Sequence, residues 1–125
     1  MEEITIITEN KVGILAKISG LLGNSGVNIE TISAHGLGDS GLIRIVTGDT
    51  VTAKKALSLN GFSFKTGEIL VVKLSDSPGE LGKITKKLSR AGVDIESLYI
   101  LSKNKGVTEV AIKPGNFAAA QKALK

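Results

Sequence analysis

The stretch Val12-Gly13-Ile14-Leu15-Ala16-Lys17-Ile18 recurs 66 residues later as Pro78-Gly79-Glu80-Leu81-Gly82-Lys83-Ile84. The match continues from Gly26-Val27-Asn28-Ile29-Glu30 to Gly92-Val93-Asp94-Ile95-Glu96, and nine of the nineteen positions from 12 to 30 are identical in the two copies. Self-similarity at a fixed offset is the mark of an internal duplication. The chain of 125 residues therefore consists of two related repeats, which we place at residues 1–66 and 67–125.

Each repeat has the pattern of a strand, a helix, two strands and a second helix. Leu15, Ile18 and Leu22 follow the i, i+3, i+7 spacing of one helical face. Gly26 and Gly92 stand where a left-handed residue ends a helix. Runs rich in β-branched residues between Gly-containing turns predict the strands. The expected ranges are strands 4–7, 28–37, 42–46 and 62–65 with a second helix at 51–59, then strands 69–74, 94–102 and 107–112 with a last helix at 116–124.

This order predicts an α+β fold of the ferredoxin-like βαββαβ type, with both helices on one face of an antiparallel sheet. The second repeat ends at Lys125 and so lacks its last strand. A tight hairpin at Thr66-Gly67 would let one strand serve both sheets, and a strand from another chain is the alternative. Ile14 and Leu21 replace Glu80 and Lys87 of the second repeat, which indicates either a larger core or a helix that docks on a partner unit.

Composition excludes much catalytic chemistry. The chain has no cysteine and one histidine, His35, so thiolate nucleophiles, Cys-ligated metals and histidine clusters are impossible. We interpret His35 as a surface or packed residue. Pairing with Lys17 and Lys83 would explain the duplicated Glu30 and Glu96 as well as catalysis does. We therefore expect no catalytic residues, no metal and no cofactor, and we expect that the protein is not an enzyme.

The loops that enter the first helix of each repeat are the best candidates for a binding site. They read Asn10-Lys11-Val12-Gly13-Ile14-Leu15 and Asp76-Ser77-Pro78-Gly79-Glu80-Leu81. Free N–H groups at a helix start favour a carboxylate or phosphate, and the leading Asn or Asp could cap the helix or hold an ammonium group. Asn28 and Asp94 are expected to start the next strand beside these loops. Plain capping and tight packing explain the same residues without a ligand.

With these motifs in place, the chain resembles a tandem pair of ACT domains. The resemblance rests on the Asp76–Leu81 motif and on Ala91-Gly92-Val93-Asp94-Ile95, and it covers about residues 3–124. It implies a regulatory module that binds small molecules, usually amino acids, at interfaces between paired domains. Carried over to this chain, Asn10–Leu15 and Asp76–Leu81 would hold the ligand and face Asn28-Ile29 and Asp94-Ile95. Val12 departs from the proline that is usual in the family.

The resemblance also implies a homodimer or higher oligomer, which either acts alone or regulates a separate enzyme. An alternative is a basic ferredoxin-like module that binds nucleic acid, because the net charge is +4 and all of the excess lies in residues 67–125. Nucleic-acid binding is the weaker hypothesis, because the chain has only one tyrosine, three phenylalanines and no tryptophan for base stacking. The acidic amino terminus and the lack of a long apolar run favour a cytoplasmic protein without a membrane partner.

Overall fold

The computed structural model describes all residues, Met1–Lys125, and it divides into two compact units, Met1–Gly67 and Glu68–Lys125. Both units have the expected α+β, ferredoxin-like organisation, and their elements follow one another in the expected order. The boundaries differ from the sequence-based ranges by one or two residues at most ends, and hydrogen bonding in the sheets extends most strands into flanking polar residues at one end or both.

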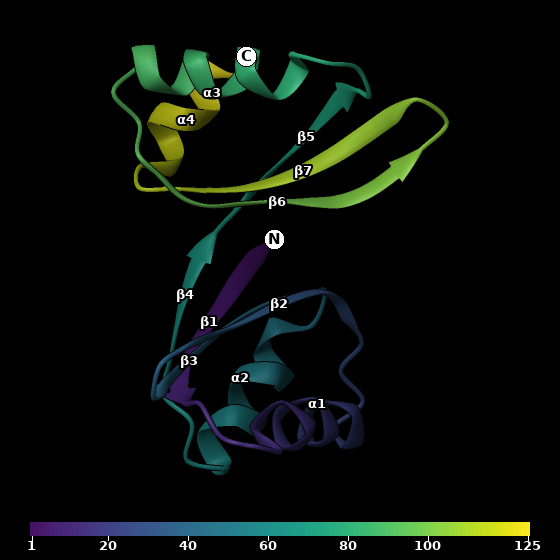
Figure 1. Cartoon of the computed structure of the whole chain (residues 1–125), viewed down its shortest axis with the longest axis vertical. Helices are drawn as coiled ribbons and strands as arrows, with labels where there is room; N and C mark the ends of the chain where they lie inside the picture. Colours follow the sequence, from purple (N-terminus) through teal and green to yellow (C-terminus); the bar gives the residue numbers. More distant parts are fainter. The chain divides into compact units, whose positions relative to one another are not determined.

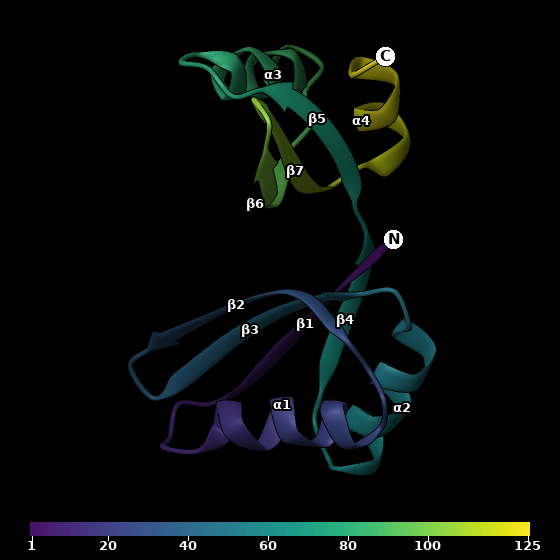
Figure 2. The same cartoon turned by 90° about the vertical axis from the view of Figure 1, so that its right-hand side faces the viewer.

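The first unit is a four-stranded antiparallel sheet with two helices on one face (Figures 1 and 2). The strand order is β2-β3-β1-β4, so the fourth strand lies beside the first. Its elements are β1 (Glu2–Glu9), α1 (Ile14–Asn24), β2 (Ile29–Leu37), β3 (Ser40–Thr47), α2 (Thr50–Leu59) and β4 (Phe64–Glu68).

The core of the first unit lies between that sheet and its helices. Alternate residues of β1 and β3 point toward the helices, so that Ile4 and Ile6 pack with Ile18 and Leu22 of α1, all four being fully buried. Ile14 and Leu21 of α1 also pack against this cluster. The wider apolar face of the first helix therefore serves a larger core.

The second unit repeats the arrangement with one strand fewer. Its sheet has the order β5-β7-β6, and two helices cover one face (Figure 1). A smaller core of its own contains Ile84 and Leu88 from the first of those helices and Val110 and Ile112 from the central strand. The elements are β5 (Leu70–Ser75), α3 (Glu80–Arg90), β6 (Ile95–Asn104), β7 (Val107–Pro114) and α4 (Phe117–Ala123).

The expected hairpin at Thr66-Gly67 is wrong. Both residues lie inside β4, which pairs in the first sheet, and the second sheet consists of β5, β6 and β7 alone. A tight turn at these residues would interrupt the hydrogen bonds between β4 and β1. Without β4, the edge of β1 would be left unpaired. One strand does not serve both sheets.

Both units end their first helix in the same way. Gly26 has φ 76° and Gly92 has φ 71°, and the amide N–H groups of the valines that follow them donate to the carbonyls of Leu22 and Leu88 at 2.9 Å. The left-handed residue lets the chain fold back over the last turn and satisfy its carbonyls. This was the role that the sequence predicted for both glycines.

Candidate functional site

The loop between the first strand and the first helix of each unit is anchored to a neighbouring hairpin. The amide N–H of Asn10 donates to the carbonyl of Asp39 in the β2–β3 turn at 2.8 Å, and Asp76 makes the equivalent bond to Gly106 in the β6–β7 turn at 2.9 Å. The first strand is antiparallel to the third, and Glu9 therefore lies opposite Ser40 at this end of the sheet. The two loops are thus held in equivalent places by equivalent bonds.

The helices that follow these loops begin with exposed hydrogen-bond donors. Gly13 and Gly79 both have φ 88°, a left-handed conformation that glycine adopts without strain, and neither helix has a side-chain cap. No backbone or side-chain acceptor faces the amide N–H groups of Leu15 and Ala16, nor those of their counterparts Leu81 and Gly82. Two donors and the positive end of a helix dipole are therefore available in each unit.

A cleft of about 310 Å³ opens beside the start of α1. It lies between the loop, the first turn of α1 and the hairpin end of β2 and β3, so that a sheet edge forms one wall and a helix start forms the other. Small and apolar residues predominate in its lining. The lining residues are Asn10, Lys11, Gly13, Ile14, Leu15, Ala16, Ala34, His35, Gly36, Gly41 and Ile43.

The second unit has a cleft in the corresponding place, of about 130 Å³. Leu15 and Leu81 line the two clefts from equivalent helix positions, and each is 42% exposed. The second cleft differs in its charged side chains, which come from the loop, the helix and the far end of β6. The lining residues are Leu74, Ser75, Asp76, Ser77, Glu80, Leu81, Ile100, Lys103, Thr108 and Val110.

The leading Asn and Asp of the loops do not cap the helices. The Asn10 side chain turns to the hairpin, where Nδ2 donates to the carbonyl of Gly38 at 2.9 Å and packs on Gly36, which has no side chain in that space. The Asp76 carboxylate pairs with Lys103 Nζ at 3.4 Å. The capping interpretation of these two side chains is therefore wrong, because the left-handed glycine directs the chain away from them.

The structure does not bring all the predicted residues together within one unit. Val12 is fully exposed and lies outside the lining of the first cleft. Pro78 and Gly79 do not line the second cleft. Neither cleft includes Asn28, Ile29, Asp94 or Ile95.

The sequence-based prediction placed Asn28 beside the loop that enters the first helix. In the structure Asn28 does not lie beside the loop of its own unit. The 11 residues of α1, about 16 Å of helix, separate the loop from the start of β2. The Asn28 carbonyl accepts a bond from Thr47 Oγ1 at the other end of the sheet, at 2.8 Å, and the Asp94 carbonyl accepts one from the Gly115 amide at 2.9 Å.

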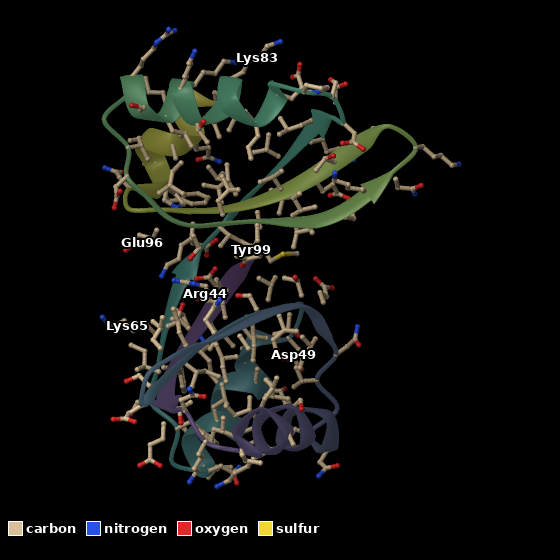
Figure 3. All side chains as sticks on the ribbon, in the orientation of Figure 1. Arg44, Asp49, Lys65, Lys83, Glu96 and Tyr99 are labelled. Atoms are coloured by element: carbon tan, nitrogen blue, oxygen red, sulfur yellow. The ribbon has the colours of Figure 1, made fainter.

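Sequence reasoning missed the contribution of the hairpin strands. His35 is exposed and lines the first cleft, together with Ala34 and Ile43. The antiparallel pairing of β1 with β3 was the signal that could have found them, because it puts the end of the first strand beside the turn between the second and third. The expected ion pairs were also wrong: Lys83 pairs with Glu80 at 3.1 Å, on the outer side of α3 (Figure 3), and Glu96 pairs with Lys113 at 3.7 Å.

No group of three or more His, Cys, Asp or Glu side chains is arranged to hold a metal ion. None of the helices is long and apolar enough to cross a membrane.

Solved structures similar to this chain share its fold. Protein BT0572 from Bacteroides thetaiotaomicron is 29% identical, with a TM-score of 0.88 over 98% of this chain and 85% of that one. The ligand-free regulatory subunit of aspartate kinase from Thermus thermophilus is 19% identical, with a TM-score of 0.70 over 98% and 89% of the two chains. Aspartokinase III of E. coli, in complex with aspartate and ADP, is 16% identical with a TM-score of 0.61, and the match covers 99% of this chain and 30% of that enzyme.

A search of curated proteins found no match. The family model described as an ACT domain pair matches residues 1–120, which is nearly the whole chain and includes both clefts. The duplicated βαββ order, the left-handed glycine before each first helix and the family match agree with the resemblance drawn from the sequence. The chain belongs to the ACT domain pair family.

Proposed function

We propose that this protein is a non-catalytic regulatory module that binds a small molecule, an amino acid by its chemistry, at a cleft beside the start of a first helix. One observation carries the proposal: a cleft lies in the corresponding place in both units, each time at the start of a helix whose first amide N–H groups have no acceptor. Family membership supports it, and so does the regulatory subunit of aspartate kinase among the proteins of similar fold.

The amino-acid chemistry follows from the groups that line the first cleft. The ligand carboxylate accepts hydrogen bonds from the N–H groups of Leu15 and Ala16 at the positive end of α1. The Asn10 side chain already donates through Nδ2 to the hairpin, and its Oδ1 accepts a hydrogen bond from the ligand ammonium. The ligand side chain lies against Ile14, Ala34 and Ile43.

Regulation requires that the ligand bind one state of the protein more tightly than another. The resemblance implies that this state is a pairing of ACT units, in a homodimer or higher assembly, with a separate enzyme as the regulated partner. In such a pairing Asn28-Ile29 and Asp94-Ile95 would reach a loop of a different unit. Ligand binding then raises the oligomeric mass, which light scattering after size-exclusion chromatography measures with and without the amino acid.

A thermal-shift screen with the twenty amino acids tests the proposed function. Because a ligand that binds the native state alone stabilises it in proportion to RT ln(1 + [L]/Kd), at 100 Kd the gain is about 2.7 kcal/mol and the Tm rises by several degrees. Asn10→Ala and Asp76→Ala then report which loop holds the ligand, by the loss of that rise. A screen in which no amino acid raises Tm would count against the proposal.

The second candidate function is nucleic-acid binding, favoured by the cations on α3. Lys83, Lys86, Lys87 and Arg90 lie on this one helix of the more basic unit. Retention on RNA or single-stranded DNA that falls steeply with salt, in a protein that no amino acid stabilises, would support this function instead.

A further inference from the structure

We propose that each chain holds one ligand molecule, in the cleft of the first unit, and that the corresponding cleft of the second unit is closed to a ligand by its larger side chains and by its carboxylates. This inference rests on the proposed function. It adds which of the two clefts binds the ligand and which chemical groups the ligand has. It follows from the differences between two sites that the duplication made alike.

The two clefts differ in size. The first, at about 310 Å³, lies at the lower end of the roughly 300–1,000 Å³ that small-molecule pockets span, whereas the second, at about 130 Å³, falls well below that range. At three positions that the strand registers make equivalent, the second unit has the larger residue: Ile100 for Ala34, Thr108 for Gly41 and Lys103 for Gly36. These side chains occupy the space along the sheet edge that the first cleft leaves open.

The two clefts also differ in charge. The first is lined by Lys11 and His35 and by no carboxylate, and Lys11 pairs with Glu9 at 3.6 Å outside the lining. The second is lined by two carboxylates, Asp76 and Glu80, and by one ammonium group, that of Lys103. A carboxylate ligand would meet attraction in the first cleft and repulsion in the second.

Two ion pairs place those charges at the second cleft. Asp76 Oδ1 lies 3.4 Å from Lys103 Nζ, which joins the loop to the end of β6 across the site. Glu80 is the first residue of α3 and pairs with Lys83 at 3.1 Å, with 28% of its side chain exposed. A carboxylate in the first turn of a helix interacts favourably with the helix dipole, so Glu80 provides the negative charge that a ligand would bring.

Position 14 is the counterpart of Glu80, and there the first unit has isoleucine. Ile14 packs against the core and lines the cleft, so the start of α1 keeps its positive end without an internal anion. Ala34 and Ile43 extend this apolar surface along the strands. The first cleft therefore fits a carboxylate with an aliphatic side chain, and L-valine, L-leucine and L-isoleucine are the probes of choice.

Titration of the ¹⁵N-labelled full chain with these three amino acids, followed by amide NMR, tests the inference. We expect the amide signals of Leu15 and Ala16 to shift on binding while those of Leu81 and Gly82 stay unchanged, and calorimetry to give one site per chain. Equal shifts at both helix starts, or two sites per chain, would overturn it. Shifts at neither start would overturn it too, whereas the proposed function fails only if none of the twenty amino acids binds.

Exchange of the two equivalent residues gives a second test. Ile14→Glu should weaken binding of the aliphatic probe by at least about tenfold, which corresponds to about 1.4 kcal/mol. Val51→Glu, an equal change of charge at an exposed position of α2 outside the cleft, should leave the affinity unchanged. If Ile14→Glu binds as tightly as the control, the first cleft is not the site.

Glu80→Ile should leave the affinity of the first cleft as it is, because it changes only the second unit. If instead this substitution abolishes binding of the aliphatic amino acids, the second cleft is the working one and the inference is wrong. The amide spectrum of each variant reports at the same time whether the chain is folded.

Discussion

Two glycines have the same unusual backbone conformation at the same place in the two units. Gly13 and Gly79 have φ 88°, and their added Cβ atoms would meet no neighbour within 4 Å, so the backbone conformation rather than space restricts these positions. A left-handed conformation costs roughly 1–2 kcal/mol in a residue with a Cβ atom. The duplication of this glycine is therefore explained by the turn that orients the first helix.

Gly13→Val and Gly79→Val should each lower the free energy of unfolding by about 1–2 kcal/mol, because valine is strained at positive φ. Gly13→Asn should cost less, since asparagine tolerates the left-handed region. Gly20→Ala in the interior of α1 is the control, and should raise stability by about 0.5–1 kcal/mol, because its Cβ atom has open space. Urea unfolding measures all four, and an equal loss for valine and asparagine would contradict the conformational explanation.

At the scale of elements, the second helices of both units begin with a side-chain cap. Asp49 accepts a hydrogen bond from the amide of Thr52 at 3.1 Å, and Asn116 accepts one from Ala119 at 3.0 Å. Hydrogen bonds from Thr52, the larger effect coming from its side chain and the smaller from its backbone, hold the pKa of Asp49 below its usual 3.8. One unit thus uses a titratable cap where the other uses a neutral one.

This difference predicts how α2 responds to acid. A carboxyl group whose pKa is lower in the folded state stabilises that state above its unfolded pKa, and the stabilisation is lost as the pH falls through the folded value. The stability of the wild-type chain should therefore fall, relative to that of Asp49→Asn, as the pH drops from about 5 to about 3. Asparagine keeps a cap that does not titrate, as at Asn116. Urea unfolding at both pH values measures this, and parallel losses in the two proteins would contradict it.

The elements themselves were largely predictable, because each rests on local signals. The 3.6-residue period of Leu15, Ile18 and Leu22 and the glycine at 26 fix α1, and β-branched runs fix the strands. The prediction of a hairpin at Thr66-Gly67 was wrong. Two residues that favour a turn did not outweigh the hydrogen bonds that β4 makes at the edge of the first sheet. Pairing between distant segments decided that point.

At the scale of the whole molecule, each unit has its own core. Leu22 belongs to the first core and Leu88, its repeat partner, to the second, and both are fully buried. The first core has ten buried residues and the second has six, and the counterparts of Ile4 and Ile6 on the edge strand β5, Leu70 and Val72, are only partly buried. Each core must support its own cleft, because the helix that supplies the free amides is held in place by these residues.

Leu22→Ala and Leu88→Ala should each cost about 2–5 kcal/mol, the usual penalty for a cavity in a packed core. Leu59→Ala is the control, since Leu59 is 80% exposed, and its effect should stay within about 0.5 kcal/mol. Thermal and urea unfolding measure all three. Near-neutral effects at both buried leucines would show that the cores are not packed as described.

The sequence by itself determined the duplication, the order of the elements, the fold class and the two loops that open the helices. These features rest on periodicity, on glycine's conformational freedom and on repetition, all of which can be read along the chain. The tertiary structure decided which residues share a cleft. It placed Asn28 at the far end of the sheet from its own loop, turned Val12 to solvent, and brought His35 and the hairpin strands to the site. Antiparallel pairing joins residues distant in sequence, and helix length separates residues that are close in it.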